Sequence, residues 1–457
     1  ATHDHGPPGC VSGGFGVVHC SHVWRRRMMR ALRPDSFEVR RVELRELVRR
    51  SREVVLLAAV TGVVTGLFVR GFEYVVHELY HQVLEAPLWW SATAPAIGLI
   101  AASLILRVIG GGASPSTSDE YLRAFHDPAY TLRPRYLVAR IAAAVATLGS
   151  GGALGLEGPS LYGGSAIGDM IQRRLPKPFR GSDHRTLLVA GAAAGVAAIF
   201  KAPATGAIFA LEVPYRDDMA RRMLLPALVA SATGYATFVT LDDTTPLLSV
   251  GDFSISSFDL IDLLGALLVG ATCAVGARSF AKLMRIAKGF SLRALPLRLA
   301  VSSISLVGLF FLSRELTGQP LSLGAGYEVF RDWLFIERDI SVWLLAAVFL
   351  IRCLASAFTT AGSGVGGVFI PLVVGGGLVG RGIAEIVHPD RAALYTLLGI
   401  AAFLGAGYRV PLAAVMFVAE TTGKPNFVVP ALFAAVAAEL VMGEQSITAF
   451  QRRPGSD

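Results

Sequence analysis

The chain has 457 residues, of which 53% are hydrophobic and 17% are charged. That charged fraction lies well below the roughly 25% of an average soluble domain, and the mean hydropathy is +0.54. These values exclude a disordered, fibrous or ordinary soluble protein. Uncharged runs recur from residue 54 to residue 442 with no polar domain between them. The composition therefore predicts one polytopic membrane protein in a lipid bilayer.

The net charge of +8 comes from 42 basic and 34 acidic residues, and the basic residues lie in short loops. No nucleic-acid recognition motif accompanies them, so we expect topology-setting loop charge and no nucleic-acid partner. Four cysteines are too few for a disulfide scaffold, and the histidines of the apolar region lack metal-ligand spacing. We therefore expect neither a metal site nor a cofactor in that region.

Residues 1–50 differ from the rest of the chain and predict a cytoplasmic, basic tail. Its first part contains several His and Cys residues that could hold a metal, but the surrounding Gly and Pro favour an unstructured segment. From Trp24 to Arg52 the sequence is dense in Arg, with Val42, Leu44, Leu47 and Val48 at helical spacing. This pattern predicts a basic amphipathic helix on the cytoplasmic membrane surface.

The apolar runs fall into two length classes. Residues 86–106 and 223–241 are uncharged over the length that spans a bilayer as a helix, and residues 353–380 exceed it. By contrast, residues 158–168, 202–211 and 410–419 are too short to cross. Short segments interrupted by Gly and Pro predict half-helices that end inside the membrane, where protein or a cavity satisfies their backbone groups.

The loops predict which ends face the cytoplasm. Residues 216–222 are rich in Arg, and residues 282–298 contain five basic side chains and no acid. Both loops are expected inside by the positive-inside rule. Residues 241–262 contain five Asp and no Lys or Arg, so this loop is expected outside. The amino terminus should then be cytoplasmic, and the bacterial inner (plasma) membrane is the expected location.

An internal repeat predicts two halves, residues 51–245 and residues 246–457, and we expect no further domain after the second. Phe200-Lys201-Ala202-Pro203 precedes Glu212, as Tyr408-Arg409-Val410-Pro411 precedes Glu420, and each Glu follows its Pro by nine residues. Pro159 and Pro371 are likewise followed by Gly at offsets four, five and nine. Two matches in the same order, about 209 residues apart, predict a twofold membrane repeat.

A twofold membrane repeat places its substrate path between the halves, where the amino termini of half-helices point inward. Free backbone amides and the positive ends of helix dipoles then offset part of the free-energy cost of dehydrating an anion. They do so without a full positive charge, which would hold the anion too tightly to release. Each half has a Gly-rich turn suited to this role, at residues 149–160 and 362–371. Glu157 lies in the first turn. Ionised, its carboxylate can occupy the amide cradle, and protonated, it can leave; the alternative is a helix cap.

These residues resemble the CLC chloride channel and transporter family. The resemblance covers roughly residues 50–450 and rests on Gly155-Leu156-Glu157-Gly158-Pro159, on residues 184–212, on Gly366-Gly367-Val368-Phe369-Ile370-Pro371 and on residues 414–422. It implies an all-α integral membrane protein of about 17–18 tilted, broken and re-entrant helices in an inverted repeat. It also implies a homodimer that moves chloride and similar small anions, with chloride as its ligand and no CBS domains.

The resemblance assigns roles to individual residues. It implies that Glu157 is the external gate and that the anion is bound by backbone amides around five positions: Leu156, Gly158, Val368, Phe369 and Ile370.

Two positions depart from the family pattern on the inner side of the path. The inner turn usually offers a serine hydroxyl, but alignment on Pro115 places Gly112 there, and Ser114 could replace it only if the turn shifts. The pore-facing tyrosine corresponds to Ile447. Both hydroxyls are therefore expected to be absent, which leaves backbone amides and a wider or more apolar inner mouth.

A third departure concerns protons. Proton-coupled members commonly have an internal glutamate directly after the position of Glu212, where this chain has Val213. Valine cannot titrate, so the sequence favours passive anion conduction by a Glu157-gated channel. The alternative is a chloride/proton antiporter that uses another internal route for protons.

Other polar residues have simpler interpretations. Glu212 and Glu420 are expected to make structural hydrogen bonds at helix ends, and Lys201 and Arg409 either attract anions to a pore mouth or pair with carboxylates. Tyr408 is interpreted as a packing aromatic. The Gly-Ser-Gly segments around Ser150 and Ser363 leave one enzyme alternative, intramembrane hydrolysis, but no intramembrane His follows at a suggestive position. The sequence therefore predicts a transporter rather than an enzyme.

Overall fold

The computed structural model describes residues 34–176, 183–242, 247–248, 258–335, 340–423 and 425–453. The His- and Cys-containing start of the tail lies outside the described residues, as does most of the loop expected to be external. The chain forms two compact units, Ala1–Val54 and Val55–Asp457. Helix α2 (Pro34–Glu85) begins in the first unit, and its part from Arg52 to Glu85 is long and apolar enough to cross a membrane. The start of the predicted surface helix lies outside the described residues, and a separate amphipathic helix on the membrane surface stays a prediction.

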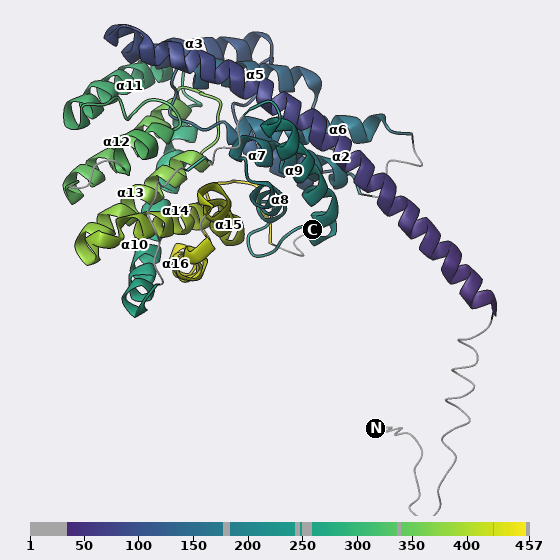
Figure 1. Ribbon diagram of the computed structural model, residues 1–457. Helices are drawn as coiled ribbons and strands as arrows, with labels where there is room; N and C mark the ends of the chain where they lie inside the picture. The colour runs from purple at the N-terminus through teal and green to yellow at the C-terminus, as the bar shows by residue number, and fades with distance from the viewer. Residues whose placement is uncertain are drawn as a thin grey trace, which may run out of the picture. The chain divides into compact units, whose positions relative to one another are not determined.

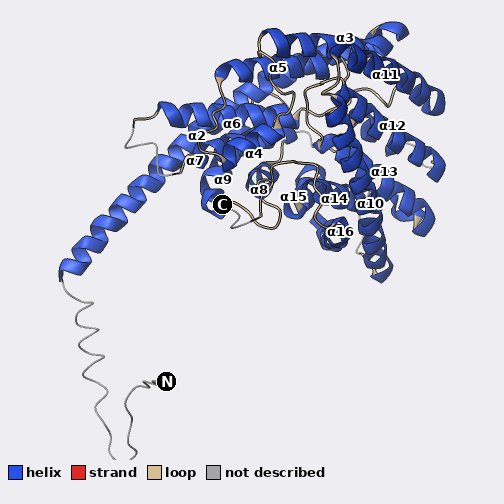
Figure 2. Ribbon diagram, turned by 180° about the vertical axis from the view of Figure 1, so that it is seen from behind, coloured by secondary structure: helices blue, strands red, loops and turns tan. Residues whose placement is uncertain are grey.

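In the described part of the second unit the helices are joined by loops and no strand is present (Figure 2), which confirms the predicted all-α class. Its first half contains α3 (Leu88–Val108), α4 (Ser118–His126), α5 (Pro134–Gly149), α6 (Glu157–Arg174), α7 (Arg185–Phe200), α8 (Pro203–Glu212) and α9 (Leu224–Val239). Its second half contains α10 (Leu260–Phe290), α11 (Leu295–Thr317), α12 (Val342–Ala361), α13 (Phe369–Val387), α14 (Ala392–Tyr408), α15 (Pro411–Thr422) and α16 (Val428–Met442). A π-helical turn, Val329–Leu334, precedes α12.

Eight helices in the described residues are long and apolar enough to cross a membrane. The predicted spans at 86–106 and 223–241 correspond to α3 and α9. The long uncharged run at 353–380 is not one helix, because the chain breaks between Ala361 and Phe369 into α12 and α13. Ser363 in this break has a φ of 66°, which a continuous right-handed helix cannot contain.

Two of the three predicted half-helices are present as α8, with 10 residues, and α15, with 12. The prediction for residues 158–168 is wrong, because this segment is part of α6, which continues to Arg174 over 18 residues. At 1.5 Å per residue each covers roughly half of a hydrocarbon core of about 30 Å. Both begin with proline, whose missing N–H is not needed in the first turn. The residues that precede them, Lys201 and Arg409, are left-handed with φ of 53° and 58°. The two halves thus turn sharply at matching positions, and α8 and α15 lie against each other (Figure 1).

The repeated glycines are contact points between helices. A Cβ on Gly164 of α6 would lie 2.1 Å from the carbonyl oxygen of Gly191 in α7, and a Cβ on Gly376 of α13 would lie 2.3 Å from that of Gly399 in α14. Only glycine allows backbones to approach this closely. The glycine pattern that reveals the repeat therefore encodes the same helix pair twice, once in each half.

Candidate functional site

The two Gly-rich turns meet and pair with each other. The first joins α5 to α6 and the second joins α12 to α13. The amide of Gly155 donates to the carbonyl of Gly367 at 2.8 Å, and the amide of Gly367 donates to the carbonyl of Gly155 at 2.7 Å. This short antiparallel contact brings the amino termini of α6 and α13 to one place, as the twofold repeat predicts.

The carboxylate of Glu157 lies between these turns, and the residue is 3% exposed. Its Oε1 accepts a hydrogen bond of 2.6 Å from the amide of Phe369, the first residue of α13. A Cβ on Gly155 or Gly367 would lie 1.9 or 2.1 Å from the carboxylate oxygens. The glycines therefore leave the space that the carboxylate fills, and its acceptor occupies the positive end of a helix dipole.

On one side of this carboxylate the protein contains a cavity of about 580 Å³. Of the residues that the sequence proposes for the anion path, Gly112, Ser114, Val368 and Ile447 line it. Leu156, Gly158, Phe369 and Ile370 do not line it; they lie at the first turns of α6 and α13. The cavity thus extends from the inner turn to the amino terminus of α13.

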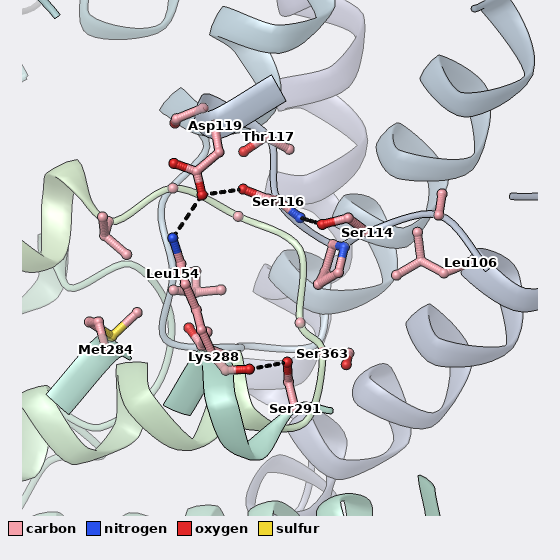
Figure 3. A pocket seen from close by; sticks show the side chains of 18 of the residues that line it. Leu106, Ser114, Ser116, Thr117, Asp119, Leu154, Met284, Lys288, Ser291 and Ser363 are labelled. Carbon is pink, nitrogen blue, oxygen red and sulfur yellow. Dashed lines mark hydrogen bonds and ion pairs between the residues drawn. The ribbon is translucent and has the colours of Figure 1, made fainter. Parts of the chain in front are cut away.

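One ion pair lies in the wall of the cavity. The carboxylate of Asp119 bonds to Lys288 Nζ at 2.8 Å and accepts a bond from the Ser116 hydroxyl at 2.9 Å. Figure 3 shows Asp119 between these two partners, which come from opposite sides of the space. The pairing offsets the negative charge of Asp119, which would otherwise repel an entering anion.

The inner turn has the geometry that glycine requires. Gly112 has a φ of 86°, a region that side chains other than glycine rarely adopt, and a Cβ there would face open space. Ser114 also lines the cavity, and its Oγ accepts a hydrogen bond of 3.1 Å from the amide of Ser116. A serine hydroxyl is therefore present in this turn, two residues after the position that alignment assigns to it.

Arg140 of α5 holds this turn in place and was not identified from the sequence. The residue is 3% exposed, and its Nε donates to the carbonyl of Ser114 at 2.9 Å. Its other nitrogens bond to Tyr162 Oη at 2.8 Å and to Glu120 Oε2 at 3.1 Å. Because Tyr162 belongs to α6, one buried guanidinium joins the inner turn to the helix that begins with Glu157.

Comparison with known proteins decides the family. The family model of the voltage gated chloride channel matches residues 97–443, which is most of the chain. The chain belongs to the CLC family. The family consists of transporters and channels rather than enzymes, which excludes the hydrolase alternative. In agreement, the Ser150 hydroxyl is engaged by the carbonyl of Thr147 at 3.0 Å.

Individual CLC relatives are distant but cover most of the chain. The H(+)/Cl(-) exchange transporter ClcA of Vibrio vulnificus (strain YJ016) is 26% identical over 418 residues, which covers 84% of this chain and 85% of the relative. ClcA of Salmonella paratyphi A is 26% identical over 433 residues, with 88% of each chain covered. The similarity therefore extends over most of the chain and most of each relative.

Solved structures show the CLC fold. A CLC-type fluoride/proton antiporter has a TM-score of 0.75 at 22% identity, with 88% of this chain and 98% of that chain covered. A slow cyanobacterial Cl-/H+ antiporter has a TM-score of 0.72 at 21% identity, with 85% and 94% covered. Likeness at this level of identity establishes the arrangement of helices.

The position where proton-coupled CLC proteins commonly have a second glutamate lies in a closed environment. Val213 is 1% exposed, and its carbonyl accepts a bond of 2.9 Å from Gln451 Nε2. The preceding Glu212 accepts bonds from the amides of Leu412, at 3.3 Å, and Ala413, at 2.9 Å, in the first turn of α15. The interpretation of Glu212 as a helix-end hydrogen-bonding group is confirmed.

Glu420 accepts hydrogen bonds at the start of α8, just as Glu212 does at the start of α15. Its carboxylate accepts bonds from the amides of Ala204, at 2.8 Å, and Thr205, at 2.6 Å, in the first turn of α8, and from the Thr205 hydroxyl at 2.6 Å. Each short CLC helix therefore begins against the glutamate that ends the other, so both amino termini receive a negative charge that the helix dipole favours.

The two repeat-related basic residues pair with carboxylates, which was one of their two predicted roles. Lys201 Nζ lies 3.0 Å from Asp242. Arg409 lies 2.6 Å from Asp217 and 2.8 Å from Glu439. The anion-attracting role stays a prediction.

The interpretation of Tyr408 as only a packing residue is incomplete. Its ring packs against Phe209 and Phe369, yet the residue also lines the cavity. No local pattern marks this role, because it arises where the end of α14 meets the start of α4 and α13. The sequence signal available was its place in the repeat, one residue before Arg409.

Proposed function

We propose that this CLC protein moves chloride and similar small anions across a membrane along a path that runs from Glu157 through the cavity beneath it. The observation that carries this proposal is the bond between the Glu157 carboxylate and the amide of Phe369. A carboxylate oxygen and a halide compete for the same kind of donor. Because its negative charge holds the Glu157 carboxylate at this amide, the side chain leaves when it is protonated and returns when it ionises.

The anion would be held by backbone donors along this path. The amides near Leu156 and Gly158 belong to the first half, and those of Val368, Phe369 and Ile370 belong to the second. Partial charges of this kind bind a dehydrated anion firmly enough to select it and weakly enough to release it. Gly112, Ser114 and Ile447 form the inner end of the proposed path.

Passive conduction is our first mechanism. Exchange requires a titratable group that delivers protons to Glu157 from the inside, and the corresponding position is Val213. Its neighbour Glu212 accepts hydrogen bonds from two amides of α15, so its carboxylate is committed to the start of that helix. With Glu157 as the gate and no such group at Val213, anion flow would not be tied to proton flow.

Chloride/proton exchange is the second candidate, and the relatives favour it. Both ClcA proteins are named exchange transporters and align over most of this chain. In this case protons would reach Glu157 through another acceptor or a water chain.

One experiment separates the two mechanisms. The purified protein is reconstituted in sealed liposomes with a chloride gradient, and chloride and proton fluxes are recorded together. A channel gives chloride flux that follows the electrochemical gradient without uphill proton movement. Proton pumping at a fixed ratio to chloride would instead establish the exchanger, and the absence of chloride flux would contradict both.

We also propose a homodimer in the bacterial inner membrane with a cytoplasmic amino terminus. The orientation rests on the basic loops at 216–222 and 282–298. Labelling of single cysteines introduced at Arg221 and at Arg293 in intact cells tests it. Both should react only with membrane-permeant reagents.

A further inference from the structure

The part of the cavity nearest Glu157 contains a phenol group that the family pattern does not predict. Tyr408 is the last residue of α14 and is 1% exposed, and it is among the residues that line the cavity. Its ring is fixed edge-on against Phe209, with centroids 5.5 Å apart, and lies 6.2 Å from the ring of Phe369. A ring held on two sides presents its hydroxyl in one place.

The Tyr408 hydroxyl meets two other donors. It interacts with the hydroxyl of Ser118, the first residue of α4, and with the backbone amide of Val368, the residue before α13. Both Ser118 and Val368 also line the cavity. Two side-chain hydroxyls and one backbone N–H therefore converge at the inner face of the turn that carries the Phe369 amide.

The charges of the cavity favour an anion, because three basic residues, Arg107, Lys288 and Arg298, line it. Glu157 and Asp119 are the carboxylates whose charges act on the Tyr408 hydroxyl. Asp119 is paired with Lys288 at 2.8 Å, which offsets its charge. Glu157 is the proposed gate itself, so its negative charge is lost when it is protonated.

The usual hydroxyls of this region are absent. Ile447 lines the cavity with an aliphatic side chain, and Gly112 has no side chain. Other hydroxyls, including those of Ser114 and Thr117, also line the cavity, so Tyr408 is distinguished by its place beside Val368 and not by being the sole side-chain donor. Hydrogen bonds to a charged group are stronger than those between neutral groups, so one well-placed phenol changes the affinity for an anion.

We propose that Tyr408, together with Ser118, supplies the side-chain donors of an inner anion seat beside the Val368 amide, in place of the hydroxyls absent at Gly112 and Ile447. The ligand class is a small monovalent anion such as chloride, and the proposal rests on the proposed anion path. The phenol reaches the seat from α14 rather than from the carboxyl-terminal segment. Tyr408 is therefore a specificity-determining residue of this chain.

The seat lies one residue along the backbone from the amide that holds Glu157. An anion at Val368 and a carboxylate at Phe369 would repel each other at close range in a water-poor interior. Occupation of the inner seat would therefore weaken the hold on ionised Glu157 and favour its departure or protonation. The Tyr408 hydroxyl would set how much chloride is needed for this effect.

The test removes one oxygen atom and keeps the ring. Tyr408→Phe retains the packing against Phe209 and Phe369 but loses the donor. The matched control is Tyr395→Phe, because Tyr395 is a second buried tyrosine of α14 that does not line the cavity. Chloride binding to each purified protein is measured by isothermal titration calorimetry, and chloride and bromide fluxes are measured in liposomes.

We expect Tyr408→Phe to weaken chloride binding about tenfold and to change the bromide-to-chloride flux ratio, whereas Tyr395→Phe changes binding by less than about twofold. Ser118→Ala provides a second variant with a smaller loss, should the first fail to fold. Binding and flux ratios equal to those of the wild type in the folded variants would overturn the inference. Wild-type protein without chloride flux would instead overturn the proposed function, so the two failures are distinguishable.

Discussion

The two halves of this CLC protein share a scaffold but not their chemistry. In both halves a left-handed basic residue precedes a proline-initiated short helix, which ends in a glutamate that caps the other short helix. The two halves differ in their Gly-rich turns. When Pro159 is aligned with Pro371, Glu157 of the first half corresponds to Phe369 of the second. The Glu157 carboxylate accepts a hydrogen bond from the backbone amide of Phe369, the corresponding residue of the other half. The shared backbone geometry brings the two turns together, and in our proposal the acid at this one position makes the path gated.

The largest expected effect comes from removing the charge that distinguishes the halves. Glu157→Gln has nearly the same shape as protonated Glu157 and cannot ionise. We expect chloride flux to rise at neutral pH and to lose its dependence on pH, because no group then competes with the anion by titration. Liposome flux measured across the range in which a carboxylate titrates checks this.

Glu78→Gln is the control for this variant, because Glu78 is exposed on α2 and bonds to Gln82. It should keep the wild-type pH response. A full pH response in Glu157→Gln would show that another group senses pH. The difference between Glu157 and Phe369 would then not explain the gating.

The reciprocal caps test the symmetric part of the comparison. Glu420→Ala removes three hydrogen bonds from the start of α8, and Glu212→Ala removes two from the start of α15. We expect each to lower the free energy of unfolding by about 2 kcal/mol, with Glu420→Ala the larger. Thermal unfolding of the purified proteins measures it, and Glu78→Ala should leave the midpoint unchanged.

Smaller losses of stability are expected at Lys201 and Arg409, the two basic residues with a left-handed backbone. Arg409 is 7% exposed and reaches two carboxylates, although Asp217 is largely exposed to solvent, which weakens that pair. We expect Arg409→Met to lower stability by about 1 kcal/mol and Lys201→Met by a few tenths, after allowance for solvent screening. Equal losses of unfolding free energy in the two variants would show that Arg409 and Lys201 stabilise the protein to the same extent.

The smallest effect is expected at Gly112. A serine there would project into open cavity space from a backbone with φ of 86°. We expect Gly112→Ser to change the bromide-to-chloride flux ratio little, because no neighbouring group would fix its hydroxyl in one position, while stability falls by about 1 kcal/mol. A sharpened ratio would indicate that the turn can shift to bring residue 112 into the path.

Much of this site could be predicted from the sequence because its determinants are local. The gating turn, the half-helices and the repeat depend on Gly, Pro and Glu at fixed offsets, which fix backbone geometry over a few residues. The role of Tyr408 could not be predicted, since it depends on three segments far apart in the chain. The Arg140 contact with the Ser114 carbonyl is equally non-local, and the break within residues 353–380 requires a positive φ at Ser363, which no rule assigns to serine.

The exchanged glutamate caps make each half depend on the other for a complete structure. The start of α8 is capped by Glu420 of the second half, and the start of α15 by Glu212 of the first. Neither short helix therefore has its amino-terminal amides satisfied until the other half is in place.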